Sequence, residues 1–264
     1  MELKPQSSPV NARLWGARAR DWADIQEGLA RPVYEAVLRR AGIGPGVRYL
    51  DVGCGAGGAA RLAAAQGARV SGIDAADTLL AIARERTPAG DFHIGDLEAL
   101  PFADGAFDVV TGFNAFQYAA NPAVALSEAW RVTKADGVVV IMTWGAPEGM
   151  PAASLVAALR PLLPAPPPGA PGPFALSDEA ALRAFAADAG LTPIEVFDVD
   201  SPWTYPDEAT AVRGLNSSGV AARAMEHSSE AAVSEAHSQA LAPFCQPDGG
   251  YRIGASFRCL LARP

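Results

Sequence analysis

The feature that most constrains the fold is a glycine-rich turn between an apolar strand and an alanine-rich helix. The segment 47–52 is a short apolar run, and Gly-Cys-Gly-Ala-Gly-Gly follows it at 53–58. Glycines let the backbone turn tightly and bring a ligand close to the bare amide groups at a helix N-terminus. The glycine spacing satisfies G-x-G-x-x-G, a pattern shared by more than one class of nucleotide-like ligand, so the turn alone does not identify what binds.

Strand and helix patterns alternate through the middle of the chain. We expect strands at 47–52, 69–73, 92–94, 107–113 and 138–143, and helices at 58–66, 76–86 and 122–133, the last capped by Asn121. The strands are mostly continuous apolar runs, as expected when helices cover both faces of a sheet. Repeated β-α units of this size predict an α/β fold with a doubly wound, mostly parallel sheet and right-handed crossovers.

The flanking segments follow a different pattern. We expect helices at 13–28, 32–41, 153–163 and 178–189, a Pro/Gly-rich loop at 164–173, strands at 194–199 and 251–261, and Ser177 as a helix cap. The alanine-rich helical segment 206–243 interrupts the alternation, which predicts an insert over one edge of the sheet. The chain therefore divides into an N-terminal helical segment (1–45), an α/β core (46–205), a helical insert (206–245) and a last strand (246–264).

Charge and composition exclude several classes of function. The formal charge of −8 repels phosphate backbones, so no nucleic-acid partner is expected. Three widely spaced cysteines without a C-x-x-C pair predict neither a disulfide framework nor a metal site. A polar start at residues 1–9 and no apolar run of spanning length predict a cytoplasmic protein without a leader or membrane association. The sequence leaves both a monomer and a homodimer open.

Three acidic positions narrow the choice of ligand class. Asp74 follows Gly55 by 19 residues, at the end of the second strand, where a carboxylate can hold two ribose hydroxyls. Asp51 precedes the first glycine, where a carboxylate suits a positive ammonium and would be poorly placed beside a pyrophosphate. Asp96 lies in Gly-Asp-Leu-Glu-Ala-Leu-Pro-Phe at 95–102, shortly before Phe-Asp-Val-Val at 107–110.

Together these motifs resemble the class I S-adenosylmethionine (SAM)-dependent methyltransferases, in the branch similar to ubiquinone/menaquinone-biosynthesis methyltransferases. The resemblance covers roughly residues 45–145. It implies a Rossmann-like sheet of seven strands with the last one antiparallel, a place that 251–261 would fill. It also implies SAM as cofactor, S-adenosylhomocysteine (SAH) as product and a small-molecule methyl acceptor as partner.

The resemblance assigns roles at the methionine end of SAM. Gly53, Cys54, Gly55 and Gly57 would form the turn around the methionine part. Asp51 would support its amino group, directly or through water.

At the adenosine end, the resemblance places Asp74 on the ribose hydroxyls and Ala75 beside the adenine. Asp96 and Leu97 would meet the adenine, with the carboxylate accepting from the exocyclic amine. Asn114, just after the fourth strand, would lie near the methionine portion or the sulfonium.

Two further groups of residues would complete the site by the same resemblance. Phe116, Gln117 and Tyr118 would follow at the mouth of the substrate pocket, with Gln117 close enough to touch the cofactor. A segment before the first strand would shield SAM from water, and its candidates are Trp15, Trp22 and Gln26. Ordinary helix packing is the alternative for that segment.

Methyl transfer from a sulfonium is an in-line displacement, and most of the rate comes from holding the two reactants in line. An oxygen acceptor of high pKa, or a carbon acid, also needs a general base. The candidates for the catalytic role are His227, His237 and Tyr118. Solvated helix positions are the alternative for both histidines.

The hypothesis favoured by the sequence is a SAM-dependent methyltransferase acting on a small molecule, by O- or C-methylation in the biosynthesis of a natural product. The alternative is a SAM-fold enzyme that binds SAM but catalyses a rearrangement or cyclisation. A nicotinamide-dependent oxidoreductase and a pure binding protein are further alternatives, and the former lacks a Tyr-x-x-x-Lys pair.

Overall fold

The computed structural model describes residues 7–166 and 172–264. Residues 1–6 lie outside the described residues. They make up most of the polar N-terminal segment from which the sequence predicts the absence of a leader. The centre of the predicted Pro/Gly-rich loop, residues 167–171, also lies outside the described residues.

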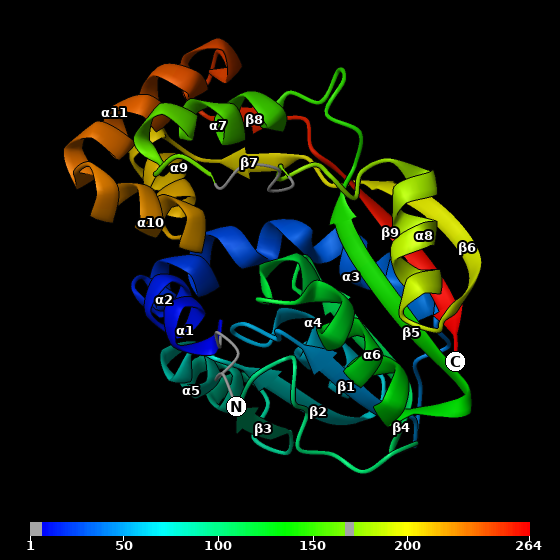
Figure 1. The fold of residues 1–264 in the computed structure, drawn as a ribbon. Coiled ribbons are helices and arrows are strands. Elements are labelled where there is room, and N and C mark those ends of the chain that lie inside the picture. Colours follow the sequence, from blue (N-terminus) through cyan, green and yellow to red (C-terminus); the bar gives the residue numbers. More distant parts are fainter. Residues whose placement is uncertain (1–6, 167–171) are drawn as a thin grey trace, which may run out of the picture.

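A seven-stranded sheet runs through the molecule in the order β3-β2-β1-β4-β5-β9-β6 (Figure 1). Its strands are β1 (Arg48–Val52), β2 (Arg69–Asp74), β3 (Asp91–Ile94), β4 (Phe107–Phe113), β5 (Thr133–Trp144), β6 (Thr192–Asp200) and β9 (Ser256–Arg263). Strand β9 pairs antiparallel with both β5 and β6, and the other pairs are parallel. The predicted fold class, with its antiparallel last strand, is confirmed.

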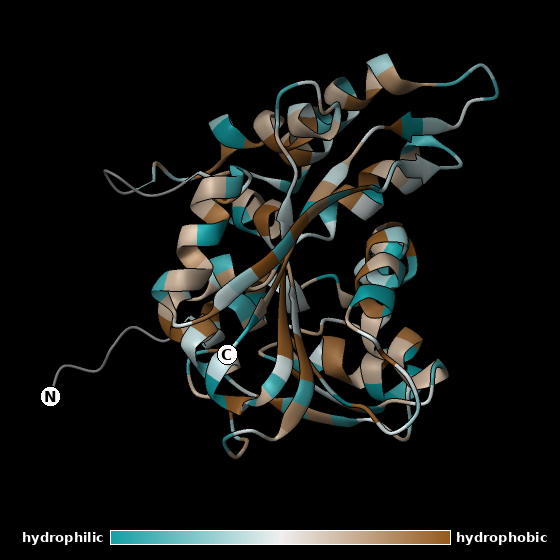
Figure 2. Cartoon of the chain, turned by 90° about the vertical axis from the view of Figure 1, so that its right-hand side faces the viewer, coloured by the Kyte–Doolittle hydropathy of each residue, from teal (hydrophilic) through white to brown (hydrophobic). Residues whose placement is uncertain are grey.

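Helices cover both faces of this sheet. One face carries α3 (Arg31–Arg40), α4 (Gly58–Ala65) and α5 (Asp77–Arg86), and the other carries α6 (Pro122–Val132) and α8 (Glu179–Asp188). Figure 2 shows apolar residues concentrated on the central strands, between these helices.

The two faces arise from the two-residue period of a strand. Tyr49 and Leu50 are neighbours in β1, and both are fully buried, on opposite faces. Leu50 packs in one core cluster with Leu126 of α6, whereas Tyr49 packs in another with Leu80 of α5. Burial of a leucine stabilises the fold by roughly 1.5–3 kcal/mol, which explains why the strands are apolar on both sides.

The order of the strands reverses between β1 and β4, because the chain passes from β3 at one edge back to β4 beside β1. In open α/β sheets, ligands bind in the crevice outside the carboxyl ends of the strands at such a reversal. The glycine turn that follows β1 and the segment that follows β4 approach each other closely there: a Cβ atom on Gly53 would stand 2.6 Å from the Ala115 Cβ.

The N-terminal segment is helical but is not the single helix predicted at 13–28. It consists of α1 (Ser8–Gly16), α2 (Ala19–Asp21), a π-helical turn (Trp22–Gln26) and a 3-10 turn (Glu27–Ala30). A straight 16-residue helix would be a rod about 24 Å long. The chain bends instead, so that Trp22, Gln26 and Glu27 each reach a different partner.

The helical insert consists of α9 (Glu208–Asn216), α10 (Gly219–His227) and α11 (Glu230–Leu241). The sequence predicted that it lies over one edge of the sheet. In the structure, α10 packs on α1, α9 packs on the π-helical turn, and α11 packs on α7 (Ala152–Ala158). The predicted final strand is also divided. Its first part, β8 (Tyr251–Ile253), pairs with β7 (Trp203–Tyr205) in a separate two-stranded sheet, and β9 begins only at Ser256.

One helix cap differs from the prediction. The side chain of Asp178, not that of Ser177, accepts a hydrogen bond from the Ala181 amide at the start of α8. Ser177 instead donates its hydroxyl to the Phe174 carbonyl. Asn121 caps α6 as predicted, by accepting from the Val124 amide.

The packing of the insert on the N-terminal segment generates a testable prediction. A Cβ atom on Gly219 would stand 2.6 Å from the Trp15 ring, so we expect Gly219→Ala to lower the free energy of unfolding by about 1–3 kcal/mol through overpacking. The matched control is Gly28→Ala, because a Cβ atom there would meet nothing within 4 Å. Urea titration of both variants measures the difference. Equal stability of the two variants would contradict the packing.

Candidate active site

The glycine turn takes its shape from backbone conformations that favour glycine. Gly53, Gly55 and Gly57 have φ angles of +72°, +55° and +81°. Residues with a Cβ atom rarely adopt this left-handed region, and glycine does so freely. Gly57 is also the N-cap of α4, so the chain passes from strand to helix within five residues.

Asp74, at the carboxyl end of β2, holds the turn from the side. Its Oδ2 accepts from the Gly55 amide at 2.9 Å, and its Oδ1 accepts from the Ala76 amide at 2.9 Å. Desolvation raises the pKa of this carboxyl, partly offset by these amide donors. Each carboxylate oxygen has a second lone pair, so both oxygens retain the capacity to accept from a ligand hydroxyl.

Asp96 and Leu97 follow β3, one strand further along the sheet. The Asp96 Oδ1 accepts from the Glu98 amide at 3.0 Å, which closes a short turn and keeps the acid at the end of the strand. Because parallel strands end at one edge of a sheet, this acid and Asp74 face the same crevice.

Asn114 follows β4 on the other side of the reversal. Among the described residues other than glycine, it alone has a positive φ angle, +54°. Such conformations are unusual outside glycine and cluster at functional sites. Its Oδ1 accepts from the Gln117 side-chain amide, so Gln117 positions Asn114.

These positions line a single pocket at the carboxyl ends of β1, β2, β3 and β4. Its wall includes the predicted cofactor residues Trp22, Gly53, Gly55, Asp74, Ala75, Asp96, Leu97 and Asn114, and the predicted catalytic residue Tyr118. The structure therefore brings together the two acids, the glycine turn and the residues after β4, although Gly53 and Tyr118 are 65 positions apart in the chain.

Asp51 lies behind the turn, inside the protein, and not in the pocket wall. It is 2% exposed, and its Oδ1 accepts from the Thr111 hydroxyl at 2.8 Å. The same hydroxyl contacts the Tyr49 hydroxyl at 2.6 Å. Burial raises the pKa of Asp51 to about 8, partly offset by the Thr111 hydrogen bond and reinforced by the nearby carboxylate of Glu27.

The N-terminal segment forms one wall of the pocket. Trp15 meets Trp22 edge-to-face at 5.0 Å between ring centroids, and it meets Tyr118 in the same way at 5.4 Å. The Asn11 side-chain amide donates to the Tyr118 carbonyl. Gln26 is not part of this wall: it is buried and accepts from the Tyr205 hydroxyl at 2.8 Å, so its predicted shielding role finds no support.

Other predicted residues lie away from the pocket wall. Phe116 is in the main core cluster, because a short 3-10 turn rotates it inward, so it is not at the mouth of the pocket. Cys54 and Gly57 belong to the turn, but both are buried. Gly57 packs against Ala83 of α5.

The two candidate histidines of the insert differ in their surroundings. His227 ends α10 and is exposed. His237 is 2% exposed in α11, and its Nδ1 contacts the Asn216 Oδ1 at 2.7 Å; burial lowers its pKa to about 4. Neither lines the pocket that contains Asp74, whereas Tyr118 does, with a pKa raised to about 12 by desolvation.

Sequence reasoning missed a buried ion pair beneath the turn. Glu27, 4% exposed, accepts from the Ala56 amide at 2.9 Å, and its other oxygen contacts Arg86 Nη1 at 2.6 Å. Burial raises the pKa of Glu27, and Arg86 opposes that shift. No motif marks either residue.

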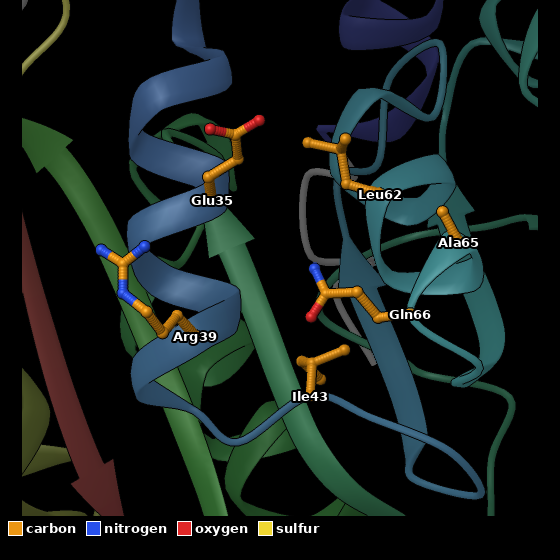
Figure 3. Close-up of a pocket in the computed structure, with 6 residues that line it drawn as sticks. All are labelled: Glu35, Arg39, Ile43, Leu62, Ala65 and Gln66. Atoms are coloured by element: carbon orange, nitrogen blue, oxygen red, sulfur yellow. The ribbon is translucent and has the colours of Figure 1, made fainter.

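A second hollow lies between α3 and α4 (Figure 3). Glu35 and Arg39 face it from α3, and Leu62 and Gln66 face it from α4. It lies beside the helices and away from the carboxyl ends of the strands. Within residues 7–166 and 172–264, no cluster of His, Cys, Asp and Glu could hold a metal ion, and no helix is long and apolar enough to cross a membrane.

Comparisons with known proteins agree with this geometry. Residues 50–141 match the family model described as "Methyltransferase domain". The chain is 35% identical over 130 residues to a malonyl-(acyl-carrier protein) O-methyltransferase of Serratia marcescens, which is 49% of this chain and 51% of that protein. It is 37% identical over 123 residues to a demethylmenaquinone methyltransferase of Renibacterium salmoninarum, covering 47% and 52%. The chain thus spans about half the length of these curated relatives.

Among solved structures, the cyclase SpnF superimposes with a TM-score of 0.61 at 19% identity, covering 100% of this chain and 98% of that one. This likeness concerns the fold alone. The fold, the pocket at the sheet reversal and the family match define a Rossmann-like methyltransferase domain. Residues 50–141 therefore match a methyltransferase domain, and the two named relatives are methyltransferases.

The buried Asp51 generates a prediction about stability and pH. Its folded pKa of about 8 is above its unfolded value of 3.8, so the stability associated with the bound proton is present below the unfolded value and is lost as pH rises through the folded one. We expect Asp51→Asn to gain stability relative to the native chain by about 1.4 kcal/mol per pH unit between pH 5 and pH 8. Urea titration at several pH values measures this difference. A difference that does not change with pH would contradict the raised pKa.

Proposed function

We propose that the protein transfers the methyl group of SAM to a small-molecule acceptor, by in-line displacement at the carboxyl ends of β1 and β4. The observation that carries this proposal is the convergence of Asp74, Asp96, Asn114 and the glycine turn on one pocket at the sheet reversal. The match of residues 50–141 to a methyltransferase domain supports SAM as the cofactor.

In this proposal, the remaining lone pairs of the Asp74 carboxylate accept from the ribose hydroxyls. Ala75 and Leu97 flank the adenine, and Asp96 accepts from its exocyclic amine. These residues follow adjacent strands, β2 and β3, so the adenosine would lie across their ends. The hydrogen bonds from Gly55 and Ala76 hold Asp74 in place for this role.

The methionine part would then lie over the glycine turn, near Asn114 and Trp22. The carboxylates of Glu27 and Asp74 raise the pKa of Asp51, and all three carboxylates raise the pKa of the Cys54 thiol, around this end of the pocket. SAM carries a positive ammonium and a positive sulfonium, and a cation beside buried carboxylates favours their ionised form. The charge of the pocket is therefore suited to SAM.

The position of the acceptor and the role of Tyr118 are further parts of this proposal. Because the acceptor must approach the methyl carbon opposite the sulfur, we propose that it enters beside Tyr118 and Asn114. At neutral pH, Tyr118 is a hydrogen-bond donor and not a base, since its pKa is about 12. The named relatives include an O-methyltransferase and a quinone-pathway methyltransferase, which supports O- or C-methylation.

Calorimetric titration with SAH tests the cofactor site. We expect the native chain to bind SAH, and Asp74→Ala and Asp96→Ala to weaken binding at least tenfold, because each removes an acceptor for adenosine. The matched control, Asp198→Asn, removes an acid that pairs with Arg258 between β6 and β9, far from the pocket, and should bind as the native chain does. No SAH binding by the native chain would refute the proposal.

Methyl transfer itself is tested by following SAH formation from SAM with a panel of phenols, quinols and carbon acids. SAH formation that depends on an acceptor supports a methyltransferase. An acceptor that is rearranged while SAM stays intact would favour the alternative, a SAM-fold enzyme that catalyses a cyclisation.

Binding of the cofactor should release a proton. At pH 7 most Asp51 side chains are protonated, since the pKa is about 8, and the positive charges of SAM lower that pKa on binding. We expect SAM affinity to rise with pH, by up to tenfold per unit, and to level off above pH 8. Calorimetry at pH 7 in buffers of different ionisation enthalpy measures the released proton directly. Asp51→Asn should abolish the release.

A further inference from the structure

Glu27 places a carboxylate where the glycine turn meets α4. The residue belongs to the N-terminal segment, 26 positions before the turn begins, yet its Oε1 accepts from the Ala56 amide at 2.9 Å. The Gly58 amide lies close enough to this carboxylate to lower its pKa. The Gly58 amide is one of the first amides of α4, which no helical carbonyl satisfies, and Ala56 lies two residues before that helix begins. The protein thus supplies its own anion to the helix N-terminus.

Arg86 of α5 holds that carboxylate and links the N-terminal segment to the glycine turn. Its Nη1 contacts the Glu27 Oε2 at 2.6 Å and donates to the Ala56 carbonyl at 3.1 Å. Its Nη2 donates to the Ala23 carbonyl at 2.6 Å. One guanidinium therefore joins the wall that carries Trp22 to the turn that follows β1.

Glu27 leaves little room for a side chain at two glycine positions of the turn. A Cβ atom on Gly55 would stand 3.1 Å from the Glu27 Oε1, and a Cβ atom on Gly58 would stand 3.1 Å from its Oε2. In dinucleotide-binding folds, the glycines of G-x-G-x-x-G make room for a pyrophosphate on the same helix N-terminus. Here a side chain fills that room.

We propose that Glu27 is a specificity-determining residue that occupies the pyrophosphate position of the turn, excludes phosphate-bearing nucleotides and holds the N-terminal wall over SAM. This inference rests on the proposed function, because it takes the pocket to be a SAM site. The negative charge of Glu27 repels a phosphate, while the same charge is compatible with the cationic methionine end of SAM.

The proposal has a consequence that a purely structural role would not produce. Without the Glu27 side chain, the Ala56 and Gly58 amides and the Arg86 guanidinium all point into one vacated space. Free backbone amides at a helix N-terminus together with an arginine are a site for an anion. Removal of Glu27 should therefore create affinity for pyrophosphate while it weakens affinity for the cofactor product.

The test is calorimetric titration of the full chain with SAH and, separately, with sodium pyrophosphate. We expect the native chain to bind SAH and not pyrophosphate at millimolar concentration. Glu27→Ala should bind SAH at least tenfold more weakly and should bind pyrophosphate measurably. Sodium acetate, a small carboxylate that fits the vacated space, should restore part of the SAH affinity. The control Asp198→Asn, which breaks an ion pair on the far edge of the sheet, should match the native chain in both titrations.

A folded Glu27→Ala variant that fails to bind pyrophosphate, or that binds SAH within twofold of the native chain, would overturn the proposal. If Glu27→Ala does not fold, Glu27→Gln keeps the size of the side chain and removes its charge. That variant should bind SAH at least threefold more weakly but should not bind pyrophosphate, because its side chain still fills the space. SAH binding within twofold of the native chain, or measurable pyrophosphate binding, would overturn the proposal equally. A native chain that does not bind SAH refutes the proposed function instead, which is a separate outcome.

Discussion

The close approach of three chain segments to the turn after β1 is the constraint on which the rest of the structure depends. Gly53 admits Ala115 from the segment after β4, Gly57 admits Ala83 from α5, and Gly58 admits Glu27 from the N-terminal segment. A methyl group at any of these positions would push one of these segments away. The pocket therefore exists because the turn has almost no side chains, and neighbouring elements supply the chemistry that it lacks.

Charge is organised around the same turn. Glu27, Asp51 and Asp74 lie on different elements, and burial raises the pKa of each. Only Glu27 has a close cationic partner, Arg86. Buried carboxyl groups without a cation are costly for the empty protein. A cofactor with two positive charges relieves that cost, so part of the binding energy that we propose for SAM is stored in the fold before the ligand arrives.

The N-terminal segment, which forms one wall of the pocket, packs on the insert. Trp15 lies between α10 and Tyr118, and ion pairs join Arg13 to Glu226 and Arg18 to Glu230. Exposed pairs of this kind contribute little stability individually, so the contacts of Trp15 and the Glu27–Arg86 pair hold this wall in place. The two least patterned regions of the sequence therefore pack against each other beside the most patterned one.

Periodicity and glycine spacing alone determined the α/β sheet and its connections, because burial on both faces demands continuous apolar strands and each β-α unit is local in the sequence. They also determined which ends of strands carry Asp74, Asp96 and Asn114. Only the tertiary structure decided what meets the turn. Glu27 and Arg86 are 59 positions apart and follow no pattern, the helix expected at 13–28 bends because its partners lie in three directions, and His237 turns inward to Asn216. Contacts between distant segments depend on how whole elements pack, and a local sequence pattern does not specify that packing.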